Sequence, residues 1–320
     1  MRRCYNGVMN ELRIVFMGSP EFALTPLKML LAEGYDICGV YTQPDRPAGR
    51  GRELCPPPVK ALALEHGLAV YQPQSLKKPE EQAVLSGLKP DVIAVAAYGL
   101  ILPQAVLDIP IYGVLNIHPS LLPRYRGATP VAATLLGGDE WAGVSLMKLE
   151  AGLDTGPVYS RAAIPVRPED TTPLLADKLA FIGGCLLLEL LSRIPSLPQP
   201  ELQDNAKATY FGMVTKDMGQ VNWQTPAAEI ERRVRAFSPW PGVFTLYNQK
   251  TLKILEASPQ KLGLGLQPSQ VRVYEGDRIM VGSASGELEI IRLQLEGKAA
   301  CSAADFLRGQ RHFDGAYLGV

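Results

Sequence analysis

Several features that would define a protein class are scarce or absent in this chain of 320 residues. Its five cysteines are scattered and contain no C-x-x-C pair, which argues against a disulfide scaffold and favours a reducing cytoplasm. Its three histidines, His66, His118 and His312, are too far apart to form a recognisable metal-ligand pattern, so no metal is expected. No apolar run approaches the roughly 20 residues of a transmembrane helix, so no membrane partner is expected.

An excess of one charge is also missing, because 32 Lys and Arg balance 32 Asp and Glu. Residues 205–320 nevertheless carry 14 Lys and Arg against 11 Asp and Glu. This small excess fits an anionic partner of the C-terminal half, but it equally fits an ordinary surface of mixed charge. Residues 1–10 lack the apolar core of a signal peptide, so we expect a disordered extension, or an early start with Met9 as the true first residue.

The types of residue change abruptly within residues 113–127, which read G-V-L-N-I-H-P-S-L-L-P-R-Y-R-G. The apolar residues at the start suit a buried strand, and alternation along that strand puts Asn116 and His118 on the same face. Pro119 ends the strand, and the loop that follows has backbone groups and cations that could surround a ligand. Because ligands of open α/β sheets bind beyond the carboxyl ends of strands, this stretch is the first candidate site.

Strands alternate with helices through the first half of the chain, which predicts a doubly wound, mostly parallel, Rossmann-like α/β sheet. We expect strands at residues 12–17, 36–41, 68–71, 91–96 and 143–149, and helices at 59–66, 79–87, 129–136 and 171–193. In the last third of the chain, short alternating runs predict strands at 243–247, 251–256, 271–274, 278–281 and 287–295. Asp154 lies in the turn E-A-G-L-D-T-G directly after the strand at 143–149. An Asp before Thr-Gly is usually only a turn former, but its position beside the strand of Asn116 and His118 makes it a candidate for the same site.

Several motifs together resemble those of the folate-dependent formyltransferases. They are N-I-H-P-S-L-L-P-x-x-x-G at residues 116–127, F-M-G-S-P-E-F at 16–22, T-Q-P-D-R-P-A-G-R-G at 42–51, A-Y-G-L-I-L-P at 97–103 and G-L-D-T-G at 152–156. With R-A-F-S-P-W-P-G at 235–242, the chain from about Leu12 onward is similar to the methionyl-tRNA formyltransferase family. The resemblance implies transfer of the formyl group of the co-substrate 10-formyltetrahydrofolate to the α-amine of initiator methionyl-tRNA.

The resemblance further implies that Asn116, His118 and Asp154 are catalytic, and the reaction explains why. Attack of an amine on the formyl carbon places negative charge on the formyl oxygen, which needs hydrogen-bond donors. The amide of Asn116 can donate one bond, and His118 another when it is protonated or in the suitable tautomer. Asp154, alone or through a water, can accept a proton from the amine and hold the imidazole charged. No serine nucleophile motif is present.

Binding residues for the two substrates follow from the same resemblance. The folate pocket is expected to include Ser120, Leu121, Leu122, Pro123, Tyr98 and Gly99. For the last two, an apolar turn that packs on the core is an alternative. The transfer RNA is expected to contact Arg46, Arg50, Arg52, Arg232, Arg233 and Arg235. Arg50, in the long loop at residues 42–58, is the best candidate, although a solvated loop and a solvated basic helix face would also explain these arginines.

The Pro-rich stretch I-P-S-L-P-Q-P at residues 194–200 predicts a linker. We therefore expect a catalytic domain at 11–194, a linker at 195–215 and a tRNA-binding, OB-like β-barrel domain at 216–320. The whole is expected to be a monomeric cytoplasmic enzyme that binds no DNA. Two alternatives stay open. A formyltransferase or deformylating hydrolase for a small substrate would not need the loop and second domain, and a silent folate- or RNA-binding module would not need all three candidate catalytic residues.

Overall fold

The structure is a computed structural model in which residues 12–48, 53–310 and 312–319 are described. The expected extension at residues 1–10 lies outside them. The chain divides into two compact units. The first comprises Met1–Gly127, Ala142–Ile164 and Ala176–Tyr210, and the second comprises Ala128–Trp141, Pro165–Leu175 and Phe211–Val320. Each unit is therefore assembled from segments that are separate in the sequence.

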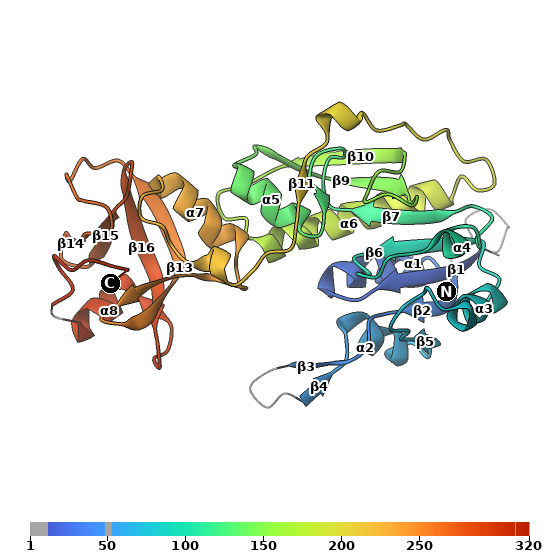
Figure 1. The fold of residues 1–320 in the computed structure, drawn as a ribbon, viewed down its shortest axis with the longest axis horizontal. Coiled ribbons are helices and arrows are strands. Elements are labelled where there is room, and N and C mark those ends of the chain that lie inside the picture. The colour runs from blue at the N-terminus through green and yellow to red at the C-terminus, as the bar shows by residue number, and fades with distance from the viewer. Residues whose placement is uncertain (1–11, 49–52, 311, 320) are drawn as a thin grey trace. The chain divides into compact units, whose positions relative to one another are not determined.

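The first unit is built on a seven-stranded sheet with the order β10-β9-β7-β6-β1-β2-β5 (Figure 1). Its strands are β1 (Arg13–Gly18), β2 (Asp36–Tyr41), β5 (Val70–Tyr71), β6 (Val92–Ala96), β7 (Val114–His118), β9 (Trp141–Lys148) and β10 (Val158–Pro165). The five neighbouring strands β7, β6, β1, β2 and β5 pair in parallel, and β9 pairs antiparallel with β7. The predicted doubly wound, mostly parallel sheet is confirmed.

Helices connect these strands. They are α1 (Leu24–Ala32), α2 (Pro58–Glu65), α3 (Pro79–Gly87), α4 (Gln104–Leu107) and α6 (Thr172–Leu191), with the 3-10 turn η1 (Glu21–Ala23) before α1. The first helical segment of the chain closely follows β1. It begins at Glu21 with Pro20 as the preceding cap, and Pro26 is the third residue of α1. A proline is tolerated there because the first-turn N–H groups have no partner within the helix.

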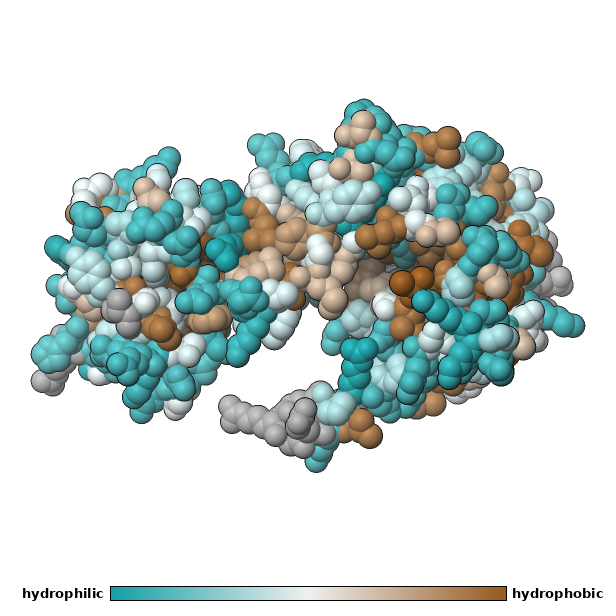
Figure 2. Space-filling model, in the orientation of Figure 1, coloured by the Kyte–Doolittle hydropathy of each residue, from teal (hydrophilic) through white to brown (hydrophobic). Residues whose placement is uncertain are grey.

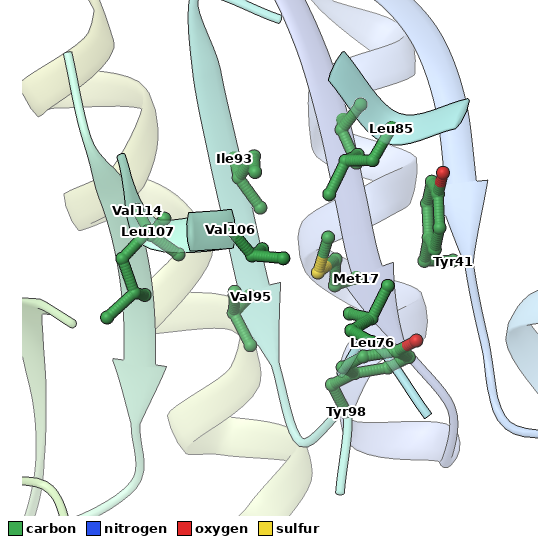
Figure 3. Packing of buried hydrophobic residues seen from close by; sticks show 11 residues of the cluster. Met17, Tyr41, Leu76, Leu85, Ile93, Val95, Tyr98, Val106, Leu107 and Val114 are labelled. Carbon is green, nitrogen blue, oxygen red and sulfur yellow. The ribbon is translucent and has the colours of Figure 1, made fainter. Parts of the chain in front are cut away.

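The core on one face of the sheet is formed by apolar side chains of β1 and β6 together with residues of the loops and helices that cover them (Figure 3). Met17, Ile93 and Val95 are buried there beside Leu76 and Leu85. A parallel sheet that is covered on both faces needs such continuous apolar strands. This packing fixes the carboxyl ends of β1, β6 and β7 at one edge of the sheet.

On the opposite face, Gly183 of α6 packs closely against the sheet. A Cβ atom at Gly183 would lie 2.3 Å from Cγ2 of Ile117 in β7 and 3.2 Å from Cγ2 of Val144 in β9. We expect Gly183→Ala to lower the free energy of unfolding by about 1–3 kcal/mol, because overpacking outweighs the better helix propensity of alanine. Urea denaturation measures the difference. Gly87→Ala in α3 is the control, because a Cβ there meets no atom within 4 Å. Equal stability of the two variants would contradict the close packing.

The second unit contains a six-stranded antiparallel sheet in the order β12-β13-β16-β15-β14, with β17 also paired to β16. The strands are β12 (Val243–Tyr247), β13 (Lys250–Gln260), β14 (Val271–Tyr274), β15 (Arg278–Gly282), β16 (Glu287–Leu295) and β17 (Cys301–Ser302). Its helices are α5 (Pro130–Gly137), α7 (Ala227–Ala236) and α8 (Ala303–Gly309), with the 3-10 turn η3 (Asp217–Gly219). The predicted strand-rich C-terminal domain is confirmed as antiparallel.

Two short pairs of strands complete the fold. The first is β3 (Arg46–Ala48) with β4 (Glu53–Cys55), and the second is β8 (Arg126–Gly127) with β11 (Tyr210–Phe211), where the 3-10 turn η2 (Asn205–Lys207) precedes β11. Within the described ranges, no helix combines the length and apolar character that a membrane span requires.

Candidate active site

The strand β7 holds two of the three predicted catalytic side chains. It lies between β6 and β9, with Asn116 opposite Val95 on one side and Met147 on the other. All five of its residues are buried, and Asn116 and His118 are only 8% and 4% exposed. Their spacing of two residues puts them on one face of the strand. The sheet therefore fixes both side chains and leaves a small part of each accessible at its edge.

The ring of His118 is oriented by a backbone carbonyl. Its Nε2 lies 3.0 Å from the carbonyl oxygen of Tyr125, in the loop that follows β7. A carbonyl oxygen only accepts, so Nε2 carries the hydrogen and donates it. When the ring is neutral, Nδ1 then has a free lone pair. The atom that is available for chemistry is therefore Nδ1.

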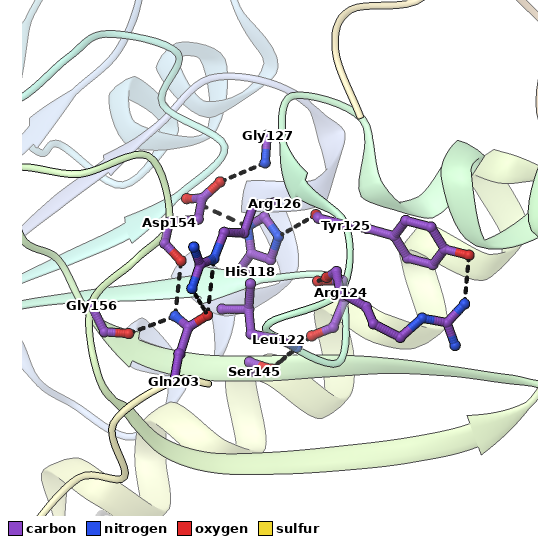
Figure 4. A network of polar contacts seen from close by, with 11 residues as sticks. His118, Leu122, Arg124, Tyr125, Arg126, Gly127, Ser145, Asp154, Gly156 and Gln203 are labelled. Carbon is purple, nitrogen blue, oxygen red and sulfur yellow. Dashed lines mark hydrogen bonds and ion pairs between the residues drawn. The ribbon is translucent and has the colours of Figure 1, made fainter. Parts of the chain in front are cut away.

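Asp154 lies directly beside that nitrogen (Figure 4). Its Oδ1 is 3.7 Å from Nδ1 of His118, which is too long for a direct hydrogen bond, and its Oδ2 accepts a bond of 2.8 Å from the backbone N–H of Gly127. Asp154 has a φ of +51°, a left-handed conformation that Asp adopts more readily than most residues. The side chains of His118 and Asp154 are 5% and 14% exposed. The predicted imidazole and carboxylate thus lie together, and Asn116 lies two residues before His118 on the same face of β7.

Burial decides the charge state of the imidazole. It lowers the pKa of His118 below the ordinary value, and the Asp154 carboxylate and the hydrogen bond to Tyr125 offset only part of this effect. The ring is therefore neutral near pH 7, a protonation state that the sequence analysis left open. No group of three potential metal ligands from His, Cys, Asp and Glu occurs in the part of the chain that the structure describes.

The loop of Asp154 is held by two residues that the sequence analysis did not identify. Gln203 donates from Nε2 to the carbonyl oxygens of Asp154 and Gly156, at 2.8 and 2.6 Å. The buried guanidinium of Arg126 in turn donates to Oε1 of Gln203, from Nε at 3.1 Å and from Nη2 at 2.9 Å. Arg126 belongs to the R-Y-R-G motif, which was expected to face a ligand. Gln203 lies in the expected linker, and no local pattern distinguishes it there.

The four residues of the S-L-L-P segment have different environments. Ser120 is buried and its Oγ donates a bond of 2.6 Å to the carbonyl oxygen of Arg124. Leu122 is buried against Met147 and Val158, and its N–H donates to Oγ of Ser145 at 3.1 Å. Leu121 and Pro123 are partly exposed. This segment is therefore anchored to the sheet, and two of its four residues retain accessible surface.

Tyr98 and Gly99 follow β6 at the same edge of the sheet. The side chain of Tyr98 is only 2% exposed and packs in the core cluster of Figure 3, while its carbonyl oxygen accepts a bond of 3.2 Å from Nε2 of Gln43. Gly99 is exposed and has a φ of +81°. The phenol thus packs as the alternative apolar-turn interpretation expected. Figure 2 shows a hollow with apolar residues at its rim near the carboxyl ends of β6 and β7.

The predicted tRNA-binding arginines divide into two groups. Arg46 is exposed in β3, at the base of a hairpin, and donates to Oε1 of Gln43. Arg50 and Arg52 lie outside the described residues. Arg232, Arg233 and Arg235 are all in α7 and only partly exposed. Two of these already have partners within the second unit, since Arg233 donates to the carbonyl oxygen of Met218 at 2.5 Å and Arg235 pairs with Glu231 at 2.5 Å.

Comparison with protein families identifies both halves of the chain. Residues 12–191 match the family described as formyl transferase, and residues 213–311 match the formyl transferase C-terminal domain. A methionyl-tRNA formyltransferase of Dehalococcoides mccartyi is 97% identical over 312 residues, which cover 98% of this chain and 100% of that protein. One of Marinobacter nauticus is 48% identical and covers 93% of this chain and 96% of the relative.

Solved structures share the fold at low sequence identity. The N-formyltransferase of Helicobacter canadensis, in complex with folinic acid and dTDP-3-aminofucose, has a TM-score of 0.66 at 18% identity and covers 87% of this chain and 98% of its own. The methionyl-tRNA formyltransferase of Clostridium thermocellum has a TM-score of 0.55 at 16% identity, with coverage of 77% and 93%. The resemblance that the motifs indicated is confirmed over nearly the whole length, and the chain belongs to the methionyl-tRNA formyltransferase family.

Proposed function

We propose that this protein transfers the formyl group of 10-formyltetrahydrofolate to the α-amino group of initiator methionyl-tRNA. Membership of the family supports the reaction, and one observation in the site supports its location. Two proton acceptors, Nδ1 of His118 and Oδ1 of Asp154, lie 3.7 Å apart at the carboxyl end of β7. Two acceptors at this distance would repel each other unless a donor lies between them. A primary amine fits this position, because it has two or more N–H groups and can donate one to each of the two acceptors.

His118 and Asp154 bind the attacking amine and remove its proton. With Nε2 donating to Tyr125, the neutral ring accepts an amine hydrogen at Nδ1 while the carboxylate accepts a second. As the amine attacks, its nitrogen becomes acidic, and the carboxylate stabilises the imidazolium that results. The Gly127 N–H holds the other carboxylate oxygen and so directs Oδ1 towards the ring. Collapse of the tetrahedral intermediate breaks the bond between the formyl carbon and the folate nitrogen, which takes the proton from the His118 imidazolium and leaves as tetrahydrofolate. The transfer therefore needs no covalent intermediate with the protein.

Asn116 stabilises the charge on the formyl oxygen. Its side-chain amide can donate, whereas the Nε2 hydrogen of His118 is already bound to a carbonyl oxygen. This leaves Asn116 as the oxygen-stabilising donor among the three residues. In the sequence analysis His118 was a second donor only if it was protonated or in the suitable tautomer, and with Nε2 bound to Tyr125 the neutral ring has no further N–H to donate.

The folate supplies an activated formyl group. Its proposed binding site is formed by the S-L-L-P segment and the backbone of Tyr98 and Gly99. The segment fits a large, partly apolar heterocycle because Leu121 and Pro123 are partly exposed, while Ser120 and Leu122 anchor them. Backbone carbonyl and N–H groups of an anchored loop are typical of small-molecule sites. The phenol of Tyr98 has a supporting role in this proposal, because it packs in the core.

The transfer RNA contacts Arg46, Arg50 and Arg52 of the 42–58 loop and Arg232, Arg233 and Arg235 of α7 in this proposal. We expect Arg50→Ala to reduce the preference for initiator over elongator methionyl-tRNA by about tenfold, because a guanidinium can pair with a phosphate or stack on a base. The ratio of kcat/KM for the two transfer RNAs measures this preference. Arg193→Ala, which removes an exposed arginine that pairs with Glu189, is the control. An unchanged ratio in Arg50→Ala would remove the assignment.

One assay tests the function. Purified protein is incubated with 10-formyltetrahydrofolate and methionyl-tRNA, with glycinamide ribonucleotide as a small amine, or with water alone. We expect formylation of methionyl-tRNA and negligible product in the other two reactions. Formylation of the small amine, or release of formate without an acceptor, would replace the proposal by one of the two enzyme alternatives. We infer that the protein acts as a monomer in the cytoplasm, where translation begins, with no DNA or membrane partner.

A further inference from the structure

A buried guanidinium lies behind the candidate active site without contacting the proposed reacting atoms. Arg126 is 1% exposed, and it donates from Nη1 to the hydroxyl of Tyr210 at 3.0 Å and from Nη2 to Oδ1 of Asn205 at 2.8 Å. The guanidinium also donates two bonds to Oε1 of Gln203. These acceptors are neutral oxygens on one segment, residues 203–210. Arg126 therefore binds that segment at three side chains.

The amide of Gln203 has every hydrogen-bonding position filled. Oε1 accepts two bonds from Arg126, and the two hydrogens of Nε2 go to the carbonyl oxygens of Asp154 and Gly156. Because a guanidinium only donates, it forces the amide oxygen towards Arg126 and the amide nitrogen towards the loop. The orientation of Gln203 is thus determined from both sides, as Figure 4 shows.

Asp154 needs such support because its backbone is in an uncommon conformation. Its φ of +51° costs energy for any residue other than glycine and persists only when the surroundings hold it. Gln203 holds the carbonyl oxygen of Asp154, and Gly127, the neighbour of Arg126 in the chain, holds its carboxylate. The short strand β8 therefore supplies one restraint directly, through Gly127, and supports the other through the bonds from Arg126 to Gln203.

We propose that Arg126 and Gln203 are positioning residues, which hold the 150–156 loop so that the carboxylate of Asp154 faces Nδ1 of His118. The expected effect on kcat rests on the proposed function. The expected effect on the position of the 150–156 loop does not. A purely structural role would be to attach the 203–210 segment to the first unit. The two roles differ because only the positioning role requires the bonds from Gln203 to the loop.

Two substitutions of Gln203 separate these roles. Gln203→Glu keeps an acceptor for Arg126 but loses both donors to the loop, whereas Gln203→Met has a similar length and loses all four bonds. Glu201→Gln is the control, because Glu201 lies two residues before Gln203 and its side chain is 70% exposed, paired with Arg161 of β10. We expect both Gln203 variants to reduce kcat for formyl transfer at least about 20-fold, with KM for each substrate within about threefold of the wild type. The control should retain full activity.

Amide exchange at Gly127 gives a second measurement that does not need activity. If Asp154 leaves its position, the N–H of Gly127 loses its acceptor and should exchange at least about tenfold faster in both Gln203 variants, while that of Ile93 in the core stays protected. An unchanged kcat, a loss that appears only in KM, or unchanged exchange at Gly127 would overturn the proposal. If the wild type fails to formylate methionyl-tRNA, the proposed function is wrong, and the exchange comparison still decides whether Gln203 positions the loop.

Discussion

Asp154→Asn is expected to reduce kcat for formyl transfer by about a thousandfold, within the range that general base groups contribute. Asparagine has nearly the same shape, tolerates the left-handed backbone conformation and can still accept from Gly127. It lacks the charge that stabilises a protonated His118 and accepts an amine hydrogen. The loss should therefore appear in kcat, while the affinity for methionyl-tRNA changes by less than about threefold.

Single-turnover kinetics with enzyme in excess, combined with a filter-binding measurement, separates these effects for Asp154→Asn. Asp36→Asn is the matched control, because Asp36 pairs with Arg13 at 3.2 Å on the surface of the same unit. It should behave like the wild type. Normal single-turnover chemistry in Asp154→Asn together with weakened tRNA binding would show that the carboxylate binds the acceptor but takes no part in proton transfer.

His118→Gln is expected to reduce kcat by about a hundredfold or more. The amide of glutamine can place a donor near the position of Nε2 and keep the bond to the Tyr125 carbonyl, but it provides no equivalent of Nδ1. The substitution therefore removes the proposed proton acceptor and preserves the tether of the loop. A milder loss would be expected if the ring only filled space beside Asp154.

The matched control for this prediction is His66→Gln, at the exposed end of α2, which should leave kcat unchanged. Circular dichroism and thermal unfolding of both variants establish that each is folded. Activity of His118→Gln within about twofold of the wild type would contradict the role of Nδ1, because an acceptor that is dispensable cannot be the general base.

The sequence predicted the regular elements well because strong local patterns define them. The strands at 36–41, 243–247, 271–274 and 287–295 match β2, β12, β14 and β16, since each is an apolar or alternating run that ends at a turn. The edge strand β10 was missed because Val158–Pro165 is mostly partly exposed and carries no clear alternation. The strand β13 is longer than residues 251–256, because irregularities between Ile254 and Ala257 let it continue through a polar stretch.

The candidate site was only partly predictable from the sequence, because some of its contacts join segments that are far apart in the chain. Spacing on one strand places Asn116 and His118 on the same face, so a local rule suffices for these two. It does not suffice for Asp154, because β9 is antiparallel to β7 and its last residue, Lys148, lies opposite Leu115 near the start of β7. The rule for carboxyl ends of strands therefore does not by itself place the following loop beside His118. Gln203 reaches the site from within the expected linker at 195–215, at a separation of 49 residues from Asp154. No local periodicity encodes such a contact. The neutral state of His118 likewise depends on burial by distant segments.

The double variant Asp154→Asn with His118→Gln tests the central claim most directly, because the claim is that imidazole and carboxylate act as one unit on the amine. Single-turnover rates of formyl transfer are measured for the wild type, the two single variants and the double variant. We predict that the double variant is about as slow as Asp154→Asn alone, since residues that act as a unit are strongly non-additive. A loss equal to the product of the two single losses would show that the groups act independently and would contradict the account.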